Sequence, residues 1–313
     1  MKKRISLNLS LLFIALITSC QAQQSKEENV ELANQFDEAF TNYWYQGKAE
    51  LSSYELTQAR YGEFRKGSAV LVFVTEDFLV DKQVKLEKET DEPSTSVLKL
   101  NFIRKFNTGI YDYSMMTSTF SPVIQDKEVY PLKSSSSSQE WCGHSWLQLN
   151  QKGQHYQVQS FSYFQSEGDV EKEIQKVLLE DGIWAQLRLN PDLIPQGKQK
   201  VFPSAHYLRF AHKELKPYTA TFNTQQNTDT TFTGEDLMAL EIHYPNLDRK
   251  VTIVYEKDFP HEIAGWKESR ISGFGANAKK METVAIKNKQ LITPYWSQNK
   301  NKDSYLRDSL KLK

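Results

Sequence analysis

The chain has 313 residues, with 39 basic and 39 acidic side chains, so its formal charge is zero. This balance leaves no excess of basic residues for a nucleic-acid-binding face, and we expect no nucleic-acid partner. Aromatic residues make up 12% of the chain, a content that suits β-rich packing.

The N-terminal segment has the pattern of a secretory signal. Three basic residues at positions 2–4 precede an apolar run that is too short to span a bilayer. The following sequence "ITSC" resembles a bacterial lipobox, which implies cleavage before Cys20 and lipid attachment to that cysteine. We therefore interpret residues 1–19 as a signal peptide and residues 20–28 as a lipidated tether.

Lipid on Cys20 would fix the protein to a membrane, because several acyl chains anchor a protein almost irreversibly. Cleavage would leave 36 basic and 39 acidic residues, a net charge of −3. Gln21, rather than aspartate, follows the cysteine, and by resemblance to Gram-negative lipoproteins this predicts the outer membrane. We expect a cell-envelope protein that faces either the periplasm or the cell surface. Cys142 is the second and last cysteine, so no intramolecular disulfide is expected.

The first half of the mature chain changes from helical to strand periodicity. Apolar residues at helical spacing favour a helix within residues 29–61. Alternating apolar and polar residues then predict strands. These strands are expected at 68–78, 82–88, 96–109, 111–123, 140–150 and 154–166. The five serines at 134–138 predict a turn or loop, and "QKG" at 151–153 predicts a hairpin connection.

The second half begins with the strongest helical pattern in the chain. Residues 169–189 predict a helix that Gly182 interrupts. Further strands are expected at 199–203, 205–212, 217–223, 237–244, 250–256, 262–275, 281–287 and 290–296. We predict an α+β, β-dominated fold: a large curved antiparallel sheet or half-barrel with a few packing helices. It would form a single domain over residues 29–300, followed by a polar tail at 301–313.

The stretch "QEWCGHSW" at 139–146 is the main candidate for chemistry. On a strand, Glu140, Cys142 and His144 would share one face. They could form a cysteine–histidine catalytic site. They could also begin a metal site completed by His155 or Glu167. The third possibility is a packed strand with a buried cysteine, which we favour because three ligands on one straight strand rarely converge. We expect no metal and no cofactor.

Other motifs carry less information. His206 and His212 would share a face of the expected strand at 205–212, as histidines at the edge of the core. The sequence "GHSW" is not a G-x-S-x-G nucleophile elbow. The G-x-G of "ISGFGANAKK" lacks the context of a phosphate-binding loop.

Several long segments resemble a family of Bacteroidota lipoproteins. They are "ELTQARYGEFRKGSAVLVFVTEDF", "LNFIRKFNTGIYDYSMMTS", "QEWCGHSW" and "YWSQNKNKDSYLRDSL". Members of this family carry the label "septum formation inhibitor Maf". Maf nucleotide pyrophosphatases have an N-terminal Ser-x-Ser-Pro-Arg-Arg motif that this chain lacks, so we expect no such activity. The resemblance implies an exported lipoprotein and brings no functional residues with it.

We therefore predict a non-enzymatic envelope lipoprotein. Its curved sheet would bind or carry a hydrophobic or polymeric ligand, or dock a partner protein. The alternative is an envelope hydrolase that uses Cys142 and His144.

Overall fold

The computed structural model describes residues 37–124 and 129–312. The chain divides into two units, residues 1–46 and 47–313. The described part of the first unit is helix α2 (Glu38–Trp44), whose N-terminal cap is the Asp37 carboxylate accepting from the Phe40 N–H at 2.7 Å. The predicted signal peptide and Cys20 lie outside the described residues.

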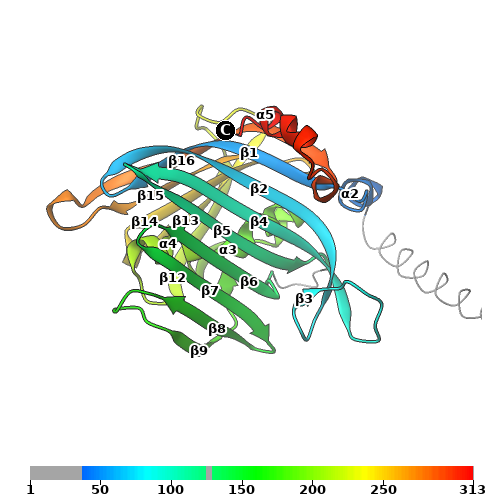
Figure 1. The fold of residues 1–313 in the computed structure, drawn as a ribbon, viewed down its shortest axis with the longest axis horizontal. Coiled ribbons are helices and arrows are strands. Elements are labelled where there is room, and N and C mark those ends of the chain that lie inside the picture. The colour runs from blue at the N-terminus through cyan, green and yellow to red at the C-terminus, as the bar shows by residue number, and fades with distance from the viewer. Residues whose placement is uncertain (1–36, 125–128, 313) are drawn as a thin grey trace, which may run out of the picture. The chain divides into compact units, whose positions relative to one another are not determined.

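The second unit is built on one sixteen-stranded sheet (Figure 1). Its strands are β1 (Ala49–Arg60), β2 (Glu63–Leu79), β3 (Val84–Lys85), β4 (Ser94–Thr108), β5 (Tyr111–Pro122), β6 (Lys133–Glu140), β7 (Gly143–Lys152), β8 (His155–Ser162), β9 (Val170–Gln175), β10 (Leu178–Leu179), β11 (Gly197–Phe202), β12 (Tyr218–Gln226), β13 (Leu237–Tyr244), β14 (Arg249–Glu256), β15 (Ile263–Ser272) and β16 (Lys279–Thr293).

Nearly all of these strands pair with an antiparallel neighbour. The order is β10-β11-β12-β13-β14-β15-β16-β1-β2-β4-β5-β6-β7-β8-β9, with β3 beside β2. Only the short β10–β11 pairing is parallel among the described strands. The two ends of this order, β9 and β10, are consecutive in the chain and are separated by residues 176–177. The sheet therefore curves until its two edges are joined by the chain itself.

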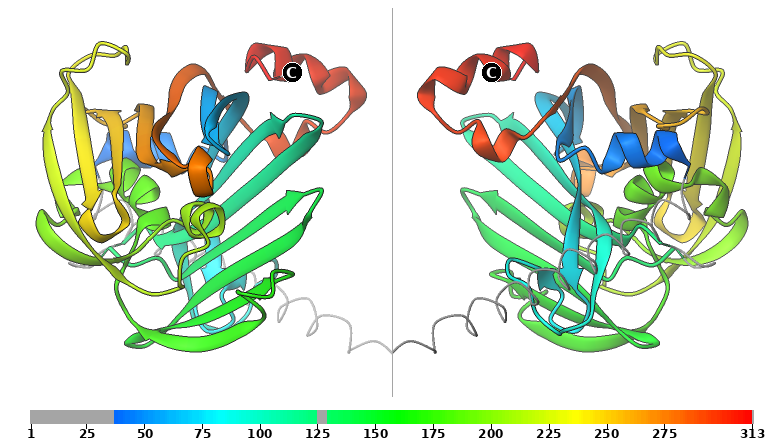
Figure 2. Two further views of the ribbon diagram at one scale, coloured as in Figure 1. Left: turned by 90° about the vertical axis from the view of Figure 1, so that its left-hand side faces the viewer. Right: turned by 90° about the vertical axis from the view of Figure 1, so that its right-hand side faces the viewer.

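Helices are few and short. They are α3 (Glu180–Leu189), α4 (Ala205–Ala211) and α5 (Tyr305–Ser309), with 3-10 turns η1 (Pro191–Leu193), η2 (Pro245–Leu247), η3 (Gly275–Asn277), η4 (Tyr295–Ser297) and η5 (Asn301–Ser304). Helices α3 and α4 lie inside the curve of the sheet (Figure 2). Among the described residues, no helix is long and apolar enough to cross a bilayer.

Helix α3 fills the middle of the concave face. All ten of its residues are buried, and it contacts β4 and β5. Trp184 from α3, Phe102 from β4 and Trp266 from β15 pack edge to face, with ring centroids 4.9–5.1 Å apart. Such aromatic pairs stabilise a core beyond the apolar area that they bury.

Buried ion pairs also fasten α3 to the sheet. Arg188 donates two hydrogen bonds of 2.5 Å to Glu50 on β1. Arg249 on β14 lies between two carboxylates, Glu180 of α3 and Glu268 of β15, with contacts of 2.6–2.7 Å. Burial alone would raise the pKa of Glu268, but neighbouring guanidinium groups, led by Arg249, lower it to about 2.

The predicted fold class is confirmed, and most of the predicted strands are present. Several segments were predicted wrongly, among them the following three. The serine run 134–138 lies within β6, where it alternates between the two faces of the sheet. Residues 170–175 form the edge strand β9, whose charged residues suit an unpaired edge. Residues 205–211 form helix α4.

The two predicted helices were also longer than the helices in the structure. The helix expected within residues 29–61 covers only 38–44 of the described residues, because β1 begins at Ala49. Of the helix expected at 169–189, only 180–189 is helical. Gly182 does not interrupt it: a Cβ at this position would overlap the Pro131 ring, so glycine permits close packing there.

Replacing Arg249 with methionine should lower the free energy of unfolding by about 3–5 kcal/mol, because it leaves two buried carboxylates without their cation. Lys250, the next residue on β14, forms a half-exposed pair with Glu241. Lys250→Met should cost less than about 1 kcal/mol. Urea unfolding of both variants would measure the difference. Equal effects would show that the buried network does not stabilise the fold.

Candidate ligand site

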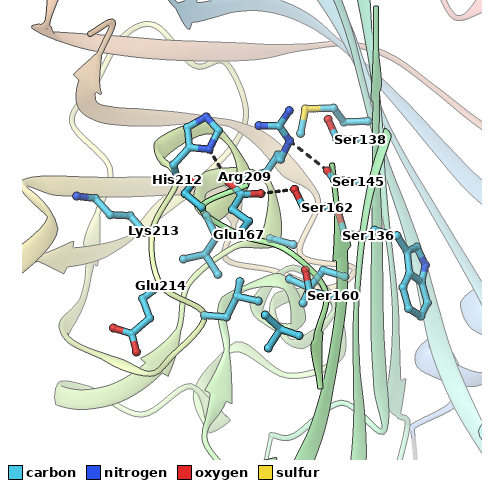
Figure 3. A pocket seen from close by; sticks show the side chains of 18 of the residues that line it. Ser136, Ser138, Ser145, Ser160, Ser162, Glu167, Arg209, His212, Lys213 and Glu214 are labelled. Atoms are coloured by element: carbon cyan, nitrogen blue, oxygen red, sulfur yellow. Dashed lines mark hydrogen bonds and ion pairs between the residues drawn. The ribbon is translucent and has the colours of Figure 1, made fainter. Parts of the chain in front are cut away.

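A cavity of about 360 Å³ lies between the sheet and helix α4, and no residue of α3 is among those that line it (Figure 3). One wall is the sheet, from β5 to β9. The other wall is helix α4 and the residues that follow it. Half of the lining residues on strands β5 to β9 are serines, and the helix contributes apolar and charged groups.

The serine wall follows from strand register. Ser138 on β6 faces Ser145 on β7, which faces Ser162 on β8. In the next row, Ser136 and Ser160 flank Leu147. Because neighbouring side chains on a strand point to opposite faces, alternate serines of β6 all turn toward α4. Their side chains are too short to reach the helix, and a space remains.

Helix α4 forms the opposite wall and is fixed at its start and its end. The Ala205 N–H donates to Asp181 Oδ2 of α3 at 3.0 Å. At the other end, His212 takes a left-handed conformation with φ of 48° and ends the helix. Leu208 and Ala205 present apolar surface to the cavity between these two points.

Arg209 of α4 carries a buried polar cluster at one end of the cavity. Its Nε donates to Ser145 Oγ at 3.1 Å, and its Nη2 donates to Glu140 Oε1 at 2.7 Å. The Arg209 and Glu140 side chains are only 8% and 2% exposed. Three buried atoms here have no hydrogen-bond partner among the described residues: Arg209 Nη1, Glu140 Oε2 and Ser138 Oγ.

A second contact joins α4 to the loop after β8. Glu167 Oε1 lies 2.5 Å from His212 Nδ1, and its Oε2 accepts from Ser162 Oγ at 2.6 Å (Figure 3). The Phe164 ring packs against both the His212 imidazole, at 4.9 Å, and the Arg209 guanidinium, at 4.4 Å. This contact holds the helix and the loop together beside the cavity.

The stretch "QEWCGHSW" is not one strand. Strand β6 ends at Glu140 and β7 begins at Gly143, so Trp141 and Cys142 form a two-residue turn. The prediction that Glu140, Cys142 and His144 share a strand face is therefore wrong. The expected burial of Cys142 is also wrong, because its side chain is exposed. A Cβ at Gly143 would overlap the Tyr163 ring, which explains glycine at the start of β7.

The Cys142 thiol is not activated by its surroundings. A hydrogen bond to Glu140 raises its pKa, and partial desolvation and the charge of Glu140 act in the same direction. His144 is exposed, whereas its neighbour Ser145 faces the cavity. A reactive thiol needs a cation or base that favours the thiolate, and here the nearest charged partner is a carboxylate.

The other histidines named from the sequence lie in different surroundings. His206 is buried within α4, with Nε2 3.2 Å from Thr117 Oγ1, and burial lowers its pKa well below the usual value. His212 lies at the cavity. Because the segment is a helix, the two do not share a strand face. His155 and Glu167, named as possible metal ligands, do not form such a site: within residues 37–124 and 129–312 no three metal-binding side chains gather.

Comparisons with known proteins give little. No family model matches the chain, and no curated protein matches it significantly. Among solved structures, it is similar to a β-barrel-like protein of a domain of unknown function, DUF1849, from Brucella abortus. The two chains are 9% identical with a TM-score of 0.37, and the alignment covers 78% of this chain and 98% of the other.

In the folded protein, Cys142 should react with iodoacetamide only as the pH rises toward and above 9, because its pKa is raised from 9.0. Alkylation rates across pH, in a mature chain with Cys20→Ser, would measure this. Glu140→Gln should speed the reaction, and His144→Ala should leave it unchanged. Rapid reaction near neutral pH that His144→Ala abolishes would instead support the hydrolase hypothesis.

Asp181 should make the protein less stable as the pH rises. Burial raises its pKa from 3.8 to about 6, so the folded protein keeps a proton that the unfolded chain releases. Its contribution is present below pH 3.8 and is lost as the pH rises through about 6. Asp181→Asn keeps an acceptor for Ala205 and cannot titrate.

Urea unfolding between about pH 4 and pH 7 would test this linkage. Relative to Asp181→Asn, the wild type should lose on the order of 1–3 kcal/mol across this range. A difference that stays constant with pH would show that Asp181 titrates normally in the folded protein.

Proposed function

We propose that this protein is an exported lipoprotein of the cell envelope that binds a small ligand without chemical conversion. The ligand site is the cavity between the serine wall and α4. One observation carries the proposal: ion pairs and aromatic rings fill the concave face around α3, whereas short serines leave about 360 Å³ open beside α4. The lipobox at Cys20 supports attachment to the envelope membrane, facing the periplasm or the cell surface.

Cavity size limits the ligand. Small-molecule sites in proteins span roughly 300–1,000 Å³, and this cavity lies near the lower limit. A single small molecule, or one end of a polymer, fits that size. The centre of the sheet is occupied by α3, all ten of whose residues are buried, and by its buried ion pairs.

The polar groups in the cavity favour binding over catalysis. In a serine hydrolase, a histidine takes the proton from the serine hydroxyl. Here Glu167 lies between Ser162 and His212, so the histidine does not contact the hydroxyl. The alternative site, Cys142 and His144, lacks a base that would form the thiolate.

Native mass spectrometry of the mature chain, purified from its own cell envelope, would test the proposal. A bound small molecule is expected in the wild type. Ser160→Leu should abolish it, because Ser160 faces the cavity and leucine would occupy the space. Ser135→Leu is the control. Ser135 lies on β6 next to the cavity residue Ser136 and therefore faces the opposite side of the sheet. A wild-type protein that is always empty, or a ligand that survives Ser160→Leu, would contradict the proposal.

A further inference from the structure

We infer that one end of the sheet contacts a lipid bilayer and places exposed apolar side chains in the membrane interface. This end is called the apolar rim, and it consists of five side chains: Phe64, Ile110, Trp141, Tyr163 and Phe274. The inference goes beyond the proposed ligand binding and does not depend on the cavity beside α4.

The five rim residues lie at five turns that are neighbours in the sheet. In sheet order, these turns join β15 to β16, β1 to β2, β4 to β5, β6 to β7 and β8 to β9. Because the strands concerned pair antiparallel, all five turns lie at the same end of the sheet. Figure 1 shows the β1–β2 and β15–β16 turns at its left-hand side.

The rim side chains are exposed although they are large and apolar. The exposed fractions are 58% for Phe274, 60% for Phe64, 80% for Ile110, 67% for Trp141 and 48% for Tyr163. A single exposed apolar residue needs no explanation, but a series of them along one edge indicates a contact surface.

Contacts between neighbouring turns make the rim continuous. The Tyr61 ring of the β1–β2 turn lies 6.1 Å from the Phe274 ring, and its hydroxyl lies 2.8 Å from a tyrosine hydroxyl of β5. The Tyr111 ring, next to the β4–β5 turn, lies 6.4 Å from the Trp141 ring. The Tyr163 ring lies against the first residue of β7. The rim is therefore ordered before it meets a partner, which favours binding.

Four of the five turns contain no charged residue. Between the strand ends they read "YG" at 61–62, "GI" at 109–110, "WC" at 141–142 and "GFGANA" at 273–278. Short turns favour Gly, Asn, Asp, Ser and Pro. Turn formation therefore does not explain Ile110 or Trp141 at these positions.

The opposite end of the sheet has different chemistry. The connection at 80–93 reads "VDKQVKLEKETDEP", and the connection at 257–262 reads "KDFPHE". Val84 is exposed at that end too, but it lies within the first of these charged connections. Burying charged groups in apolar surroundings is costly. The uncharged turns of the rim can enter such surroundings without that cost.

A bilayer surface fits the rim better than a partner protein does. Protein interfaces bury apolar groups in a closely packed core of matching shape. The rim side chains instead stand on separate turns along a curved edge, and none of them lines the cavity beside α4. The membrane interface needs no matching shape. It favours Trp and Tyr, such as Trp141 and Tyr163, because their rings combine an apolar body with a polar group.

The lipid expected on Cys20 would bring the rim to a membrane. Strand β1 begins at Ala49, at the end of the sheet opposite the rim, and residues 21–48 connect it to that cysteine. With α2 helical, these residues reach up to about 80 Å, at roughly 3.3 Å per extended and 1.5 Å per helical residue. The 17 residues of β2 span about 56 Å. The rim can therefore contact the membrane that holds the lipid.

A fluorophore on Cys142 would test contact with lipid. Cys142 lies beside Trp141, and in a mature chain with Cys20→Ser it is the only thiol. A nitrobenzoxadiazole label, attached at alkaline pH, should emit more strongly and at shorter wavelength when phosphatidylcholine vesicles are added. The control carries the label on Gln154→Cys in a Cys142→Ser chain. Gln154 lies in the β7–β8 turn at the opposite end, and its label should not respond.

Vesicle flotation of tryptophan variants gives a second result. Trp141→Ser should weaken binding to phosphatidylcholine vesicles about 10-fold, because it removes one large apolar side chain from the interface. Trp296→Ser is the matched control, since Trp296 is half-exposed and follows β16 at the opposite end. Ile110→Ser should also weaken binding, which keeps the test valid if Trp141→Ser does not fold. Added salt should leave wild-type binding unchanged, because uncharged side chains carry it.

Several results would overturn the inference. They are the absence of vesicle binding, equal responses of the two labels, and equal effects of Trp141→Ser and Trp296→Ser. A wild-type dimer that Trp141→Ser dissociates, without vesicle binding, would show that the rim joins two copies of the chain. These outcomes are separate from the proposed function, whose test is the ligand retained by the purified protein.

Discussion

Buried ion pairs between α3 and the sheet determine how the concave face is organised. Glu50 and Arg188 are 138 residues apart in sequence, and Glu180 and Arg249 are 69 apart. A buried charge without its partner is strongly destabilising, so these pairs permit few alternative positions for the helix. Because β1 and β14 lie in different parts of the sheet, α3 also connects strands that do not pair with each other.

The position of α4 depends on that of α3. Asp181, in the first turn of α3, accepts the N–H of Ala205 at the start of α4. Arg209 fastens the middle of the helix to Glu140, and His212 fastens its end to Glu167. One cavity wall is thus held at three points, and the other wall belongs to a hydrogen-bonded sheet. A site built in this way needs little ordering when a ligand binds, which favours affinity.

The sequence predicted the sheet well because alternation is a local property. Strands β4 and β8 bury alternate residues, and that period is visible in the sequence without knowledge of the neighbouring strands. The serine run was misread for the opposite reason. Serine is common in loops, and only the pairing of β6 with β5 and β7 makes 134–138 a strand.

The site could be predicted only in fragments. Glu140 and Glu167 were named, but with catalytic or metal-binding roles. Arg209 was not predicted, because it is 69 residues from Glu140 in sequence and no local sequence pattern indicates their contact. The segment that contains Arg209 was also predicted as a strand, whereas it is helix α4. The run of serines at 134–138 was a signal of the cavity wall, but its composition was interpreted as a turn or loop.

The serines are the main support for the proposed binding function. On the neighbouring strands, the same side of the sheet is filled by large groups such as Phe102, Phe106 and Met115. Apolar side chains on β6 and β8 would extend this packing to α4 and bury more apolar surface. Folding alone therefore favours larger residues at Ser136, Ser138 and Ser160. Functional sites are where a protein is expected to depart from the packing that favours folding. The cavity between the serines and α4 is such a departure.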